Sequence, residues 1–188
     1  MAPLALVCLA LAGLCAYKAL WLWRVSRKDA GRVQAARWAA GEAVNAANPH
    51  GAATWLVRVF LARRTGEPKT DRGILHEIRR AMDARVDDWL APIGVLAAIA
   101  PLLGLLGTVL GMTAAFDVLS VFGTGNARAM AASISEALVT TETGLLIAIP
   151  GVYMKGFLDR RAEQVKTRLS RIVIHLEVHA LQAKGPMP

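Results

Sequence analysis

The sequence predicts an all-α integral membrane protein with three transmembrane helices. Three apolar segments carry this prediction: residues 2–23, 89–116 and 129–154. Each is long enough to cross a hydrocarbon core of about 30 Å, which takes roughly 20 helical residues. The 188-residue chain is 55% hydrophobic and has a formal net charge of +8, a combination typical of membrane proteins with basic flanks. No strand-like alternation of apolar and polar residues persists, and no internal repeat is visible.

The basic residues predict how the three helices are oriented. Thirteen of the 22 lysines and arginines lie in residues 24–88 and seven follow residue 154, whereas the connection between the second and third helices has only Arg128. The positive-inside rule therefore places the N-terminus outside, and residues 24–88 and the C-terminal tail in the cytoplasm. Lys18 inside the first segment favours a retained signal anchor over a cleaved signal peptide. Because this topology explains the basic excess, no nucleic-acid partner is expected.

The predicted organisation alternates membrane helices with helical cytoplasmic regions. In the cytoplasmic region, the Ala-rich residues 33–47 favour a helix and Thr70-Asp71 is expected to start another. Pro92 and Pro101 are expected to bend or interrupt the second membrane helix. The six predicted segments are a first transmembrane helix (1–23), a cytoplasmic helical region (24–88), a second transmembrane helix (89–122), a short outer loop (123–129), a third transmembrane helix (130–156) and a cytoplasmic helical tail (157–188).

Two surfaces on the second and third helices predict helix contacts. Gly104, Gly107 and Gly111 recur at intervals of three and four residues, and such a small-residue stripe lets another helix approach closely. The third helix is expected to continue into the cytoplasm as an amphipathic tail. Ile172, Leu176 and His179 indicate this amphipathic character, and subunits are expected to associate along the tail.

Residues 133–144 place two carboxylates and five hydroxyls in a segment that is otherwise apolar. Placing a carboxylate at membrane depth costs free energy, so such a group usually faces protein or water and often lies on an ion path. Glu136 and Glu142 are therefore candidate ion-path residues. Thr108 and Thr141 join them, because they are equidistant from the centre of the outer connection and so lie at similar depth. The secondary polar candidates are Thr113, Asp117, Ser133 and Thr140.

An alternative interpretation of the hydroxyls is that they hold helices together, since Ser and Thr often form hydrogen bonds across membrane helices or to their own backbone. For Thr113 or Thr143 alone this interpretation is favoured. For Thr108, Thr141 and the two glutamates together an ion path is favoured, because buried acids mark ion pathways more often than scaffolds.

No constellation in the sequence points to an enzyme, a metal site or a cofactor. A nucleophile–base set, a Gly-rich phosphate loop and a cysteine–metal cluster are all missing from it. His175 and His179 have a spacing that a metal could use, but without a further ligand a solvated or packed pair is the better interpretation. Cys8 and Cys15 are interpreted as packing residues, because ~10 Å of helical rise between them excludes a disulfide.

Two sequence motifs carry a resemblance to a known family. Ala-Pro-Leu-Leu-Gly-Leu-Leu-Gly-Thr-Val-Leu-Gly-Met stands at 100–112, and Ile-Ser-Glu-Ala-Leu-Val-Thr-Thr-Glu-Thr-Gly-Leu-Leu-Ile-Ala-Ile-Pro-Gly follows at 134–151. In this order and spacing they resemble the MotA/TolQ/ExbB proton-channel family over about residues 89–182. Three membrane helices with the N-terminus outside are similar to its ExbB and TolQ branches.

The resemblance implies a homo-oligomer, most often a pentamer, in the bacterial inner membrane, with a periplasmic N-terminus and a cytoplasmic C-terminus. It implies a pore that holds the membrane helix of an ExbD/TolR-like single-span partner, and a TonB/TolA-like protein that receives the energy of proton flow. Thr108 and Thr141 match the pore threonines of the family, and Glu136 matches the glutamate of the third helix. Glu142 departs from the pattern, because a small apolar residue usually stands there.

Three functions are weighed on these grounds. The favoured one is a proton-channel subunit of an energy-transducing motor. The second is a non-conducting membrane scaffold that oligomerises through the glycine stripe and the tail helices. It predicts that Glu136→Gln and Thr141→Val alter assembly but do not change any ion-coupled activity. The third is a passive channel that needs no partner, and it predicts conductance from the purified protein alone.

Overall fold

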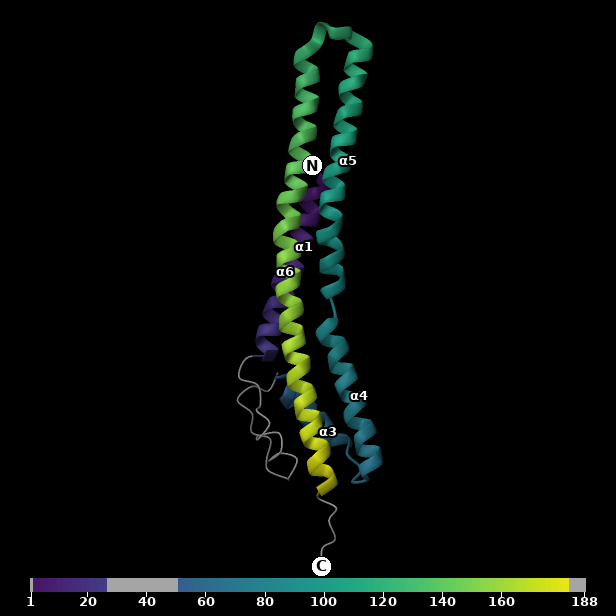
Figure 1. Ribbon diagram of the computed structural model, residues 1–188, viewed down its shortest axis with the longest axis vertical. Helices are drawn as coiled ribbons and strands as arrows, with labels where there is room; N and C mark the ends of the chain where they lie inside the picture. The colour runs from purple at the N-terminus through teal and green to yellow at the C-terminus, as the bar shows by residue number, and fades with distance from the viewer. Residues whose placement is uncertain (1, 27–50, 183–188) are drawn as a thin grey trace, which may run out of the picture. The chain divides into compact units, whose positions relative to one another are not determined.

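The computed structural model describes residues 2–26 and 51–182, and every regular element in them is a helix (Figure 1). Three of these helices, α1, α5 and α6, are long and apolar enough to cross a membrane, which confirms the predicted fold class. The helix predicted over residues 33–47 lies outside the described residues. The elements are α1 (Ala2–Ser26), α3 (Ala52–Arg63), α4 (Pro68–Asp87), α5 (Leu90–Phe122), the 3-10 turn η1 (Gly123–Asn126) and α6 (Ala127–Gln182).

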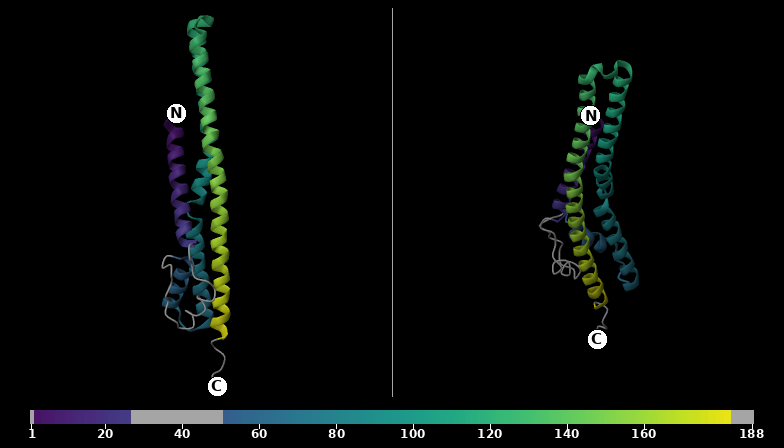
Figure 2. Two further views of the ribbon diagram at one scale, coloured as in Figure 1. Left: turned by 90° about the vertical axis from the view of Figure 1, so that its left-hand side faces the viewer. Right: turned by 45° about the horizontal axis from the view of Figure 1, so that its top comes forward.

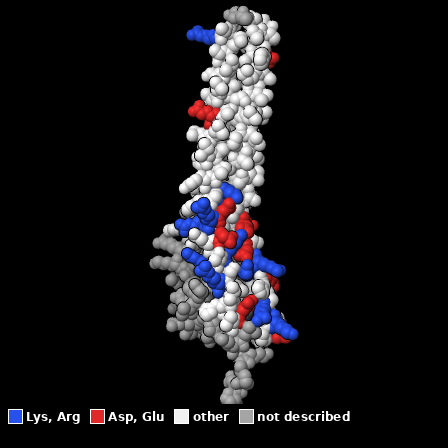
Figure 3. Space-filling view, in the orientation of Figure 1, with Lys and Arg blue, Asp and Glu red and all other residues white. Residues whose placement is uncertain are grey.

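The chain divides into two compact units, and α1 and α6 each contribute a segment to both. The first unit consists of Met1–Tyr17 and Trp89–Phe157, and the second of Lys18–Asp88 and Leu158–Pro188. Charged side chains gather over the second unit, whereas the visible face of the first is almost free of them (Figure 3). This is the distribution expected if the first unit lies in hydrocarbon and the second in water.

In the first unit, α5 and the beginning of α6 form an antiparallel hairpin closed by η1 (Figure 2). Neither proline of α5 interrupts the helix. Pro92 lies in its first turn, where the missing N–H would have no helical partner, and the helix continues through Pro101. The helical conformation is broken just before α5 instead, at Trp89, whose φ of 70° is left-handed and uncommon for a residue with a large side chain.

The helices of the second unit bury apolar side chains at helical spacing. α3 buries Leu56 and Val57, and the continuation of α6 buries side chains at intervals of three and four residues. Ile172 and Leu176 are among them, with exposed fractions of 3% and 1%. The predicted amphipathic character of the tail is therefore confirmed, and this face lies in the core of the second unit. Association of subunits along the tail stays a prediction. The buried residues of this face of α6 are Leu158, Ala162, Val165, Leu169, Ile172, Val173 and Leu176.

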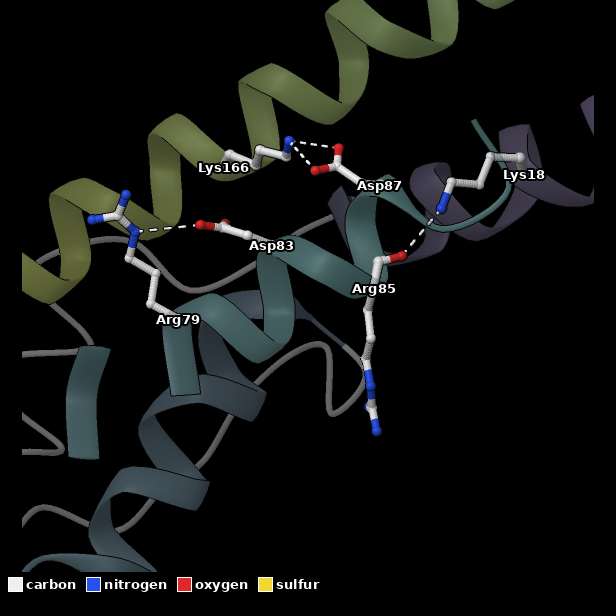
Figure 4. A network of polar contacts seen from close by, with 6 residues as sticks. All are labelled: Lys18, Arg79, Asp83, Arg85, Asp87 and Lys166. Carbon is white, nitrogen blue, oxygen red and sulfur yellow. Dashed lines mark hydrogen bonds and ion pairs between the residues drawn. The ribbon is translucent and has the colours of Figure 1, made fainter. Parts of the chain in front are cut away.

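Polar contacts fix the end of α4 within the second unit (Figure 4). Lys18 of α1 is only 2% exposed, and its ammonium donates to the main-chain oxygen of Arg85 at 3.2 Å. The same ammonium lies 4.5 Å from the centroid of the Trp21 ring. Asp87 forms an ion pair with Lys166 of α6 at 2.6 Å. A cation beside the last carbonyls of a helix is favourable because these groups lack helical donors and carry partial negative charge.

Asp71 has a different role from the one predicted. α4 begins at Pro68, earlier than the expected Thr70-Asp71 start, and the Asp71 carboxylate turns back to the loop that precedes the helix. It accepts hydrogen bonds from the Thr65 amide at 2.7 Å, the Thr65 hydroxyl at 3.0 Å and the Gly66 amide at 3.1 Å. The side chain is buried, and these three bonds compensate its lost hydration.

Candidate functional site

The candidate site is built on a close contact between α5 and α6. A Cβ added to Gly107 would lie 2.4 Å from the hydroxyl oxygen of Thr140, and one added to Gly111 would lie 2.5 Å from the Cβ of Ala137. Side chains at these positions would therefore force the helices apart. This confirms that the glycine stripe admits a neighbouring helix, and it identifies that helix as α6 of the same chain.

At the centre of this contact Thr141 is bonded across the hairpin. Its hydroxyl donates to the main-chain oxygen of Gly104 on α5 at 3.1 Å. The two backbones come together here, because a Cβ on Gly144 would lie 2.9 Å from the main-chain oxygen of Ala100 and 3.0 Å from the Gly104 Cα. Thr141 is half-buried at the edge of the contact. The contact thus brings a hydroxyl and a carbonyl together deep in an apolar unit.

Most other hydroxyls of the hairpin bond to their own helix. Thr108 donates to the main-chain oxygen of Leu105 at 2.6 Å, and Thr140 donates mainly to that of Ala137 at 2.7 Å, with a longer contact of 3.4 Å to Gly104. Among the described hydroxyls with a hydrogen bond, Thr141 alone bonds only to the opposite helix. The remaining ones that bond within their own helix are those of Thr113, Ser120, Ser133 and Thr143.

Thr108 and Thr141 share one edge of the hairpin. Thr140 packs over Gly107, whereas Thr141, about 100° further round α6, meets Gly104. On α5, Thr108 lies about 40° from Gly104 on the side away from Gly107. The contacts that pair Gly104 with Thr141 also place Thr108 within about one helical turn of it along the hairpin axis. The two hydroxyls therefore lie at similar depth on the same side.

The two glutamates leave the hairpin in other directions. Glu136 precedes Thr140 by one turn and lies about 140° from Thr141 around α6, while Glu142 lies about 100° beyond Thr141, facing away from α5. Both side chains are exposed, and neither carboxylate has a hydrogen bond or ion pair within residues 2–26 and 51–182. A single chain does not bring Glu136 to the threonine pair. Each carboxylate therefore needs water or another polypeptide to meet it.

The secondary candidates fall into two groups. Thr140 is buried inside the helix contact, and Ser133 is half-buried with its hydroxyl bonded to Ala129. Thr113 and Asp117 are exposed on α5 towards its outer end. The structure adds the carbonyl of Gly104, which no side-chain pattern reveals. The only signal for it in the sequence is the glycine itself, within a stripe that permits close approach.

Fold and site together define a helical, multi-pass membrane protein with polar groups at the middle of its central hairpin. The particular family follows from comparison with known proteins. The model of the MotA/TolQ/ExbB proton channel family matches residues 51–171, which include α3, α4, α5 and most of α6, and the chain belongs to this family.

Several curated relatives are named biopolymer transport protein ExbB. The protein of Neisseria gonorrhoeae is 35% identical over 100 residues, which cover 53% of this chain and 46% of the relative. That of Xanthomonas campestris pv. campestris is 31% identical over 90 residues, 48% of this chain and 35% of the relative. That of Aquifex aeolicus is 36% identical over 72 residues, 38% and 49% of the two chains. The matches span about half or less of the length of these relatives.

Proposed function

We propose that this chain is the proton-channel subunit of an inner-membrane motor that uses the proton motive force to power work at the outer membrane. In this proposal it forms a homo-oligomer around the membrane helix of an ExbD/TolR-like partner. The resemblance to the MotA/TolQ/ExbB family implies that this oligomer is a pentamer. The energy passes to a TonB- or TolA-like protein. Membership of the proton channel family and relatives named for biopolymer transport support this assignment.

The observation that carries the proposal is the shared edge of Thr108 and Thr141. Two hydroxyls lie there at similar depth in a unit whose other exposed side chains are mostly apolar. Oxygen atoms in such a place replace water around a cation or around a hydrated proton. Glu136 and Glu142, which lack a partner within the described chain, take up and release protons or meet polar groups of the partner protein.

The scaffold alternative is less well supported. It assigns oligomerisation to the glycine stripe and to the tail helices. The stripe is covered by α6 of the same chain, and Ile172 and Leu176 are buried in the second unit. The stripe is therefore not free for a second subunit, so this alternative loses one of its two contacts and keeps the exposed side of the tail with Ile174 and Val178.

The test is proton flux into vesicles that contain the chain together with its single-span partner. Thr141→Val and Glu136→Gln should each abolish most of the flux while the oligomer stays intact by native mass measurement. Thr167→Val and Glu163→Gln make the same chemical changes at exposed positions of α6 in the second unit, and they should leave the flux unchanged. Full flux in both hairpin variants would overturn the assignment.

Vesicles with the chain alone distinguish the passive channel. We expect no proton flux without the partner, because the edge that carries Thr108 and Thr141 needs a polar surface of the partner to complete the ion path. Flux of equal size with and without the partner would favour the passive channel over the motor.

A further inference from the structure

The hydroxyl of Thr141 has one proton, and the structure shows where that proton goes. A main-chain carbonyl has no hydrogen to donate, so in the contact between Thr141 and Gly104 the hydroxyl must be the donor. The lone pairs of the hydroxyl oxygen remain available to other groups. Thr108 is in the same state, because its proton is held by the carbonyl of Leu105 at 2.6 Å.

Thr141 differs from most other hydroxyls of the hairpin because its hydrogen bond crosses to the opposite helix. A threonine in a helix ordinarily donates to the carbonyl three or four residues earlier. Thr140 and Thr108 do so, with the carbonyls of Ala137 and Leu105 three residues earlier. Thr141 turns to α5 instead, where the Gly104 carbonyl lies within reach.

We propose that the main-chain carbonyl of Gly104 is a positioning group for the ion path: it binds the proton of Thr141, so that Thr141 and Thr108 offer only acceptor oxygens to whatever passes along their edge. This inference rests on the proposed function, since it assumes that Thr141 lies on that path. The species that suit an acceptor-only edge are cations and hydrogen-bond donors, such as hydrated protons.

Glycine at positions 104 and 144 is what allows the bond to form. A Cβ on Gly104 would lie 3.0 Å from the main-chain oxygen of Thr140 and 3.1 Å from the Cα of Thr141. Alanine at 104 keeps the carbonyl and both hydroxyls, yet it must separate the helices at the point where the 3.1 Å bond crosses. Gly156→Ala is the matched control, because nothing lies within 4 Å of a Cβ added there.

The hydrogen bond can be observed directly by solid-state NMR of the assembled complex. With carbonyl-13C glycine and 15N leucine, only three Gly–Leu pairs of the chain give a signal, those at Gly13, Gly104 and Gly144. Thr141→Val should shift the Gly104 carbonyl resonance upfield, because a lost hydrogen bond deshields the carbonyl carbon less, and Thr141→Ser should restore it. Gly13, which has open space around it, is the internal reference. An unchanged Gly104 resonance in Thr141→Val would overturn the inference.

Measurements of proton flux then test whether the hydrogen bond between Thr141 and Gly104 matters for the ion path. Gly104→Ala should lower the flux by about tenfold, the largest change that one lost hydrogen bond usually produces, whereas Gly156→Ala should not change it. In Gly104→Ala the same carbonyl is followed with carbonyl-13C alanine and 15N leucine. If its resonance no longer responds to Thr141→Val, so that the bond is lost, and the variant keeps full flux, the positioning role is wrong and the proposed function stands. If Thr141→Val and Glu136→Gln both keep full flux, the proposed function fails.

Discussion

The Thr141 hydroxyl and the Gly104 carbonyl join α5 and α6 by a bond of 3.1 Å at the place where the two backbones come closest. One residue earlier, Thr140 is buried in the contact and bonds within its own helix. The two adjacent threonines therefore have different roles, since Thr140 fills the space over Gly107 and Thr141 lies at the edge of the hairpin. The division follows from the rotation of about 100° between successive residues of a helix.

Larger residues in the glycine stripe should destabilise the hairpin. Gly107→Ala and Gly111→Ala place a methyl group 2.4 Å from the Thr140 hydroxyl oxygen and 2.5 Å from the Ala137 Cβ, so the helices must move apart. The expected cost is about 1–3 kcal/mol each, measured as a lower free energy of unfolding in detergent. Gly156→Ala is the control and should not lower it. Equal stability of all three variants would contradict the packing described above.

Glu142 should matter for activity and not for stability. Its side chain is exposed and has no polar partner within the described residues, so its replacement leaves no group of the chain unsatisfied. We expect Glu142→Leu to unfold at the same temperature as the parent protein, or higher, and to lose proton flux in the presence of the partner. Glu142→Gln, which keeps polar atoms but not the charge, distinguishes a need for the carboxylate from a need for any polar group. Normal flux in Glu142→Leu would exclude a role in the path.

Lys18 should stabilise the second unit. It is almost fully buried, and its ammonium satisfies the Arg85 carbonyl at the end of α4. Lys18→Met removes this donor and should lower the free energy of unfolding by about 1–3 kcal/mol, the cost of leaving a buried polar group without a partner. Lys69→Met changes an exposed lysine at the start of α4, and we expect it to remain within about 0.5 kcal/mol of the parent. An equal loss of unfolding free energy in both variants would contradict this role of Lys18 at the end of α4.

Asp71 should be the most sensitive acidic residue of α4. Its buried carboxylate accepts three hydrogen bonds from Thr65 and Gly66, so Asp71→Ala leaves two main-chain N–H groups without their acceptor. The expected loss is about 1–3 kcal/mol of unfolding free energy. Hydrogen exchange at the Thr65 and Gly66 amides should also accelerate, whereas Glu163→Ala, at an exposed site of α6, should change neither quantity. Slow exchange at both amides in Asp71→Ala would contradict the role of the Asp71 carboxylate as their acceptor.

The predicted orientation can be tested by labelling with a membrane-impermeant thiol reagent. With Cys8 and Cys15 replaced by alanine, Asn126→Cys in η1 should react in intact cells with a permeable outer membrane. Gln164→Cys, exposed in the charged part of α6, should react only after the inner membrane is opened. The expectation follows from the distribution of basic residues. The reverse pattern would show that the topology is inverted.

Local sequence patterns were sufficient for much of the architecture. Apolar length predicted the three membrane helices, and the spacing of Gly104, Gly107 and Gly111 predicted a close helix contact, because both depend on residues within a few turns of one another. The positions of polar residues within the apolar segments also predicted polar groups at the middle of the hairpin. The start of α4 was predicted two residues late, since Asp71 resembles a helix-starting residue but is used by the preceding loop.

Tertiary structure decided the partners of these features. The sequence did not determine that α6 of the same chain covers the glycine stripe, that the face with Ile172 and Leu176 is buried within the second unit, or that Glu136 leaves the hairpin on the other side from Thr141. Each depends on the register and rotation of helices that are distant along the chain. A shift of one residue turns a helical side chain by about 100°, so only the packed hairpin shows which hydroxyl meets the carbonyl of Gly104.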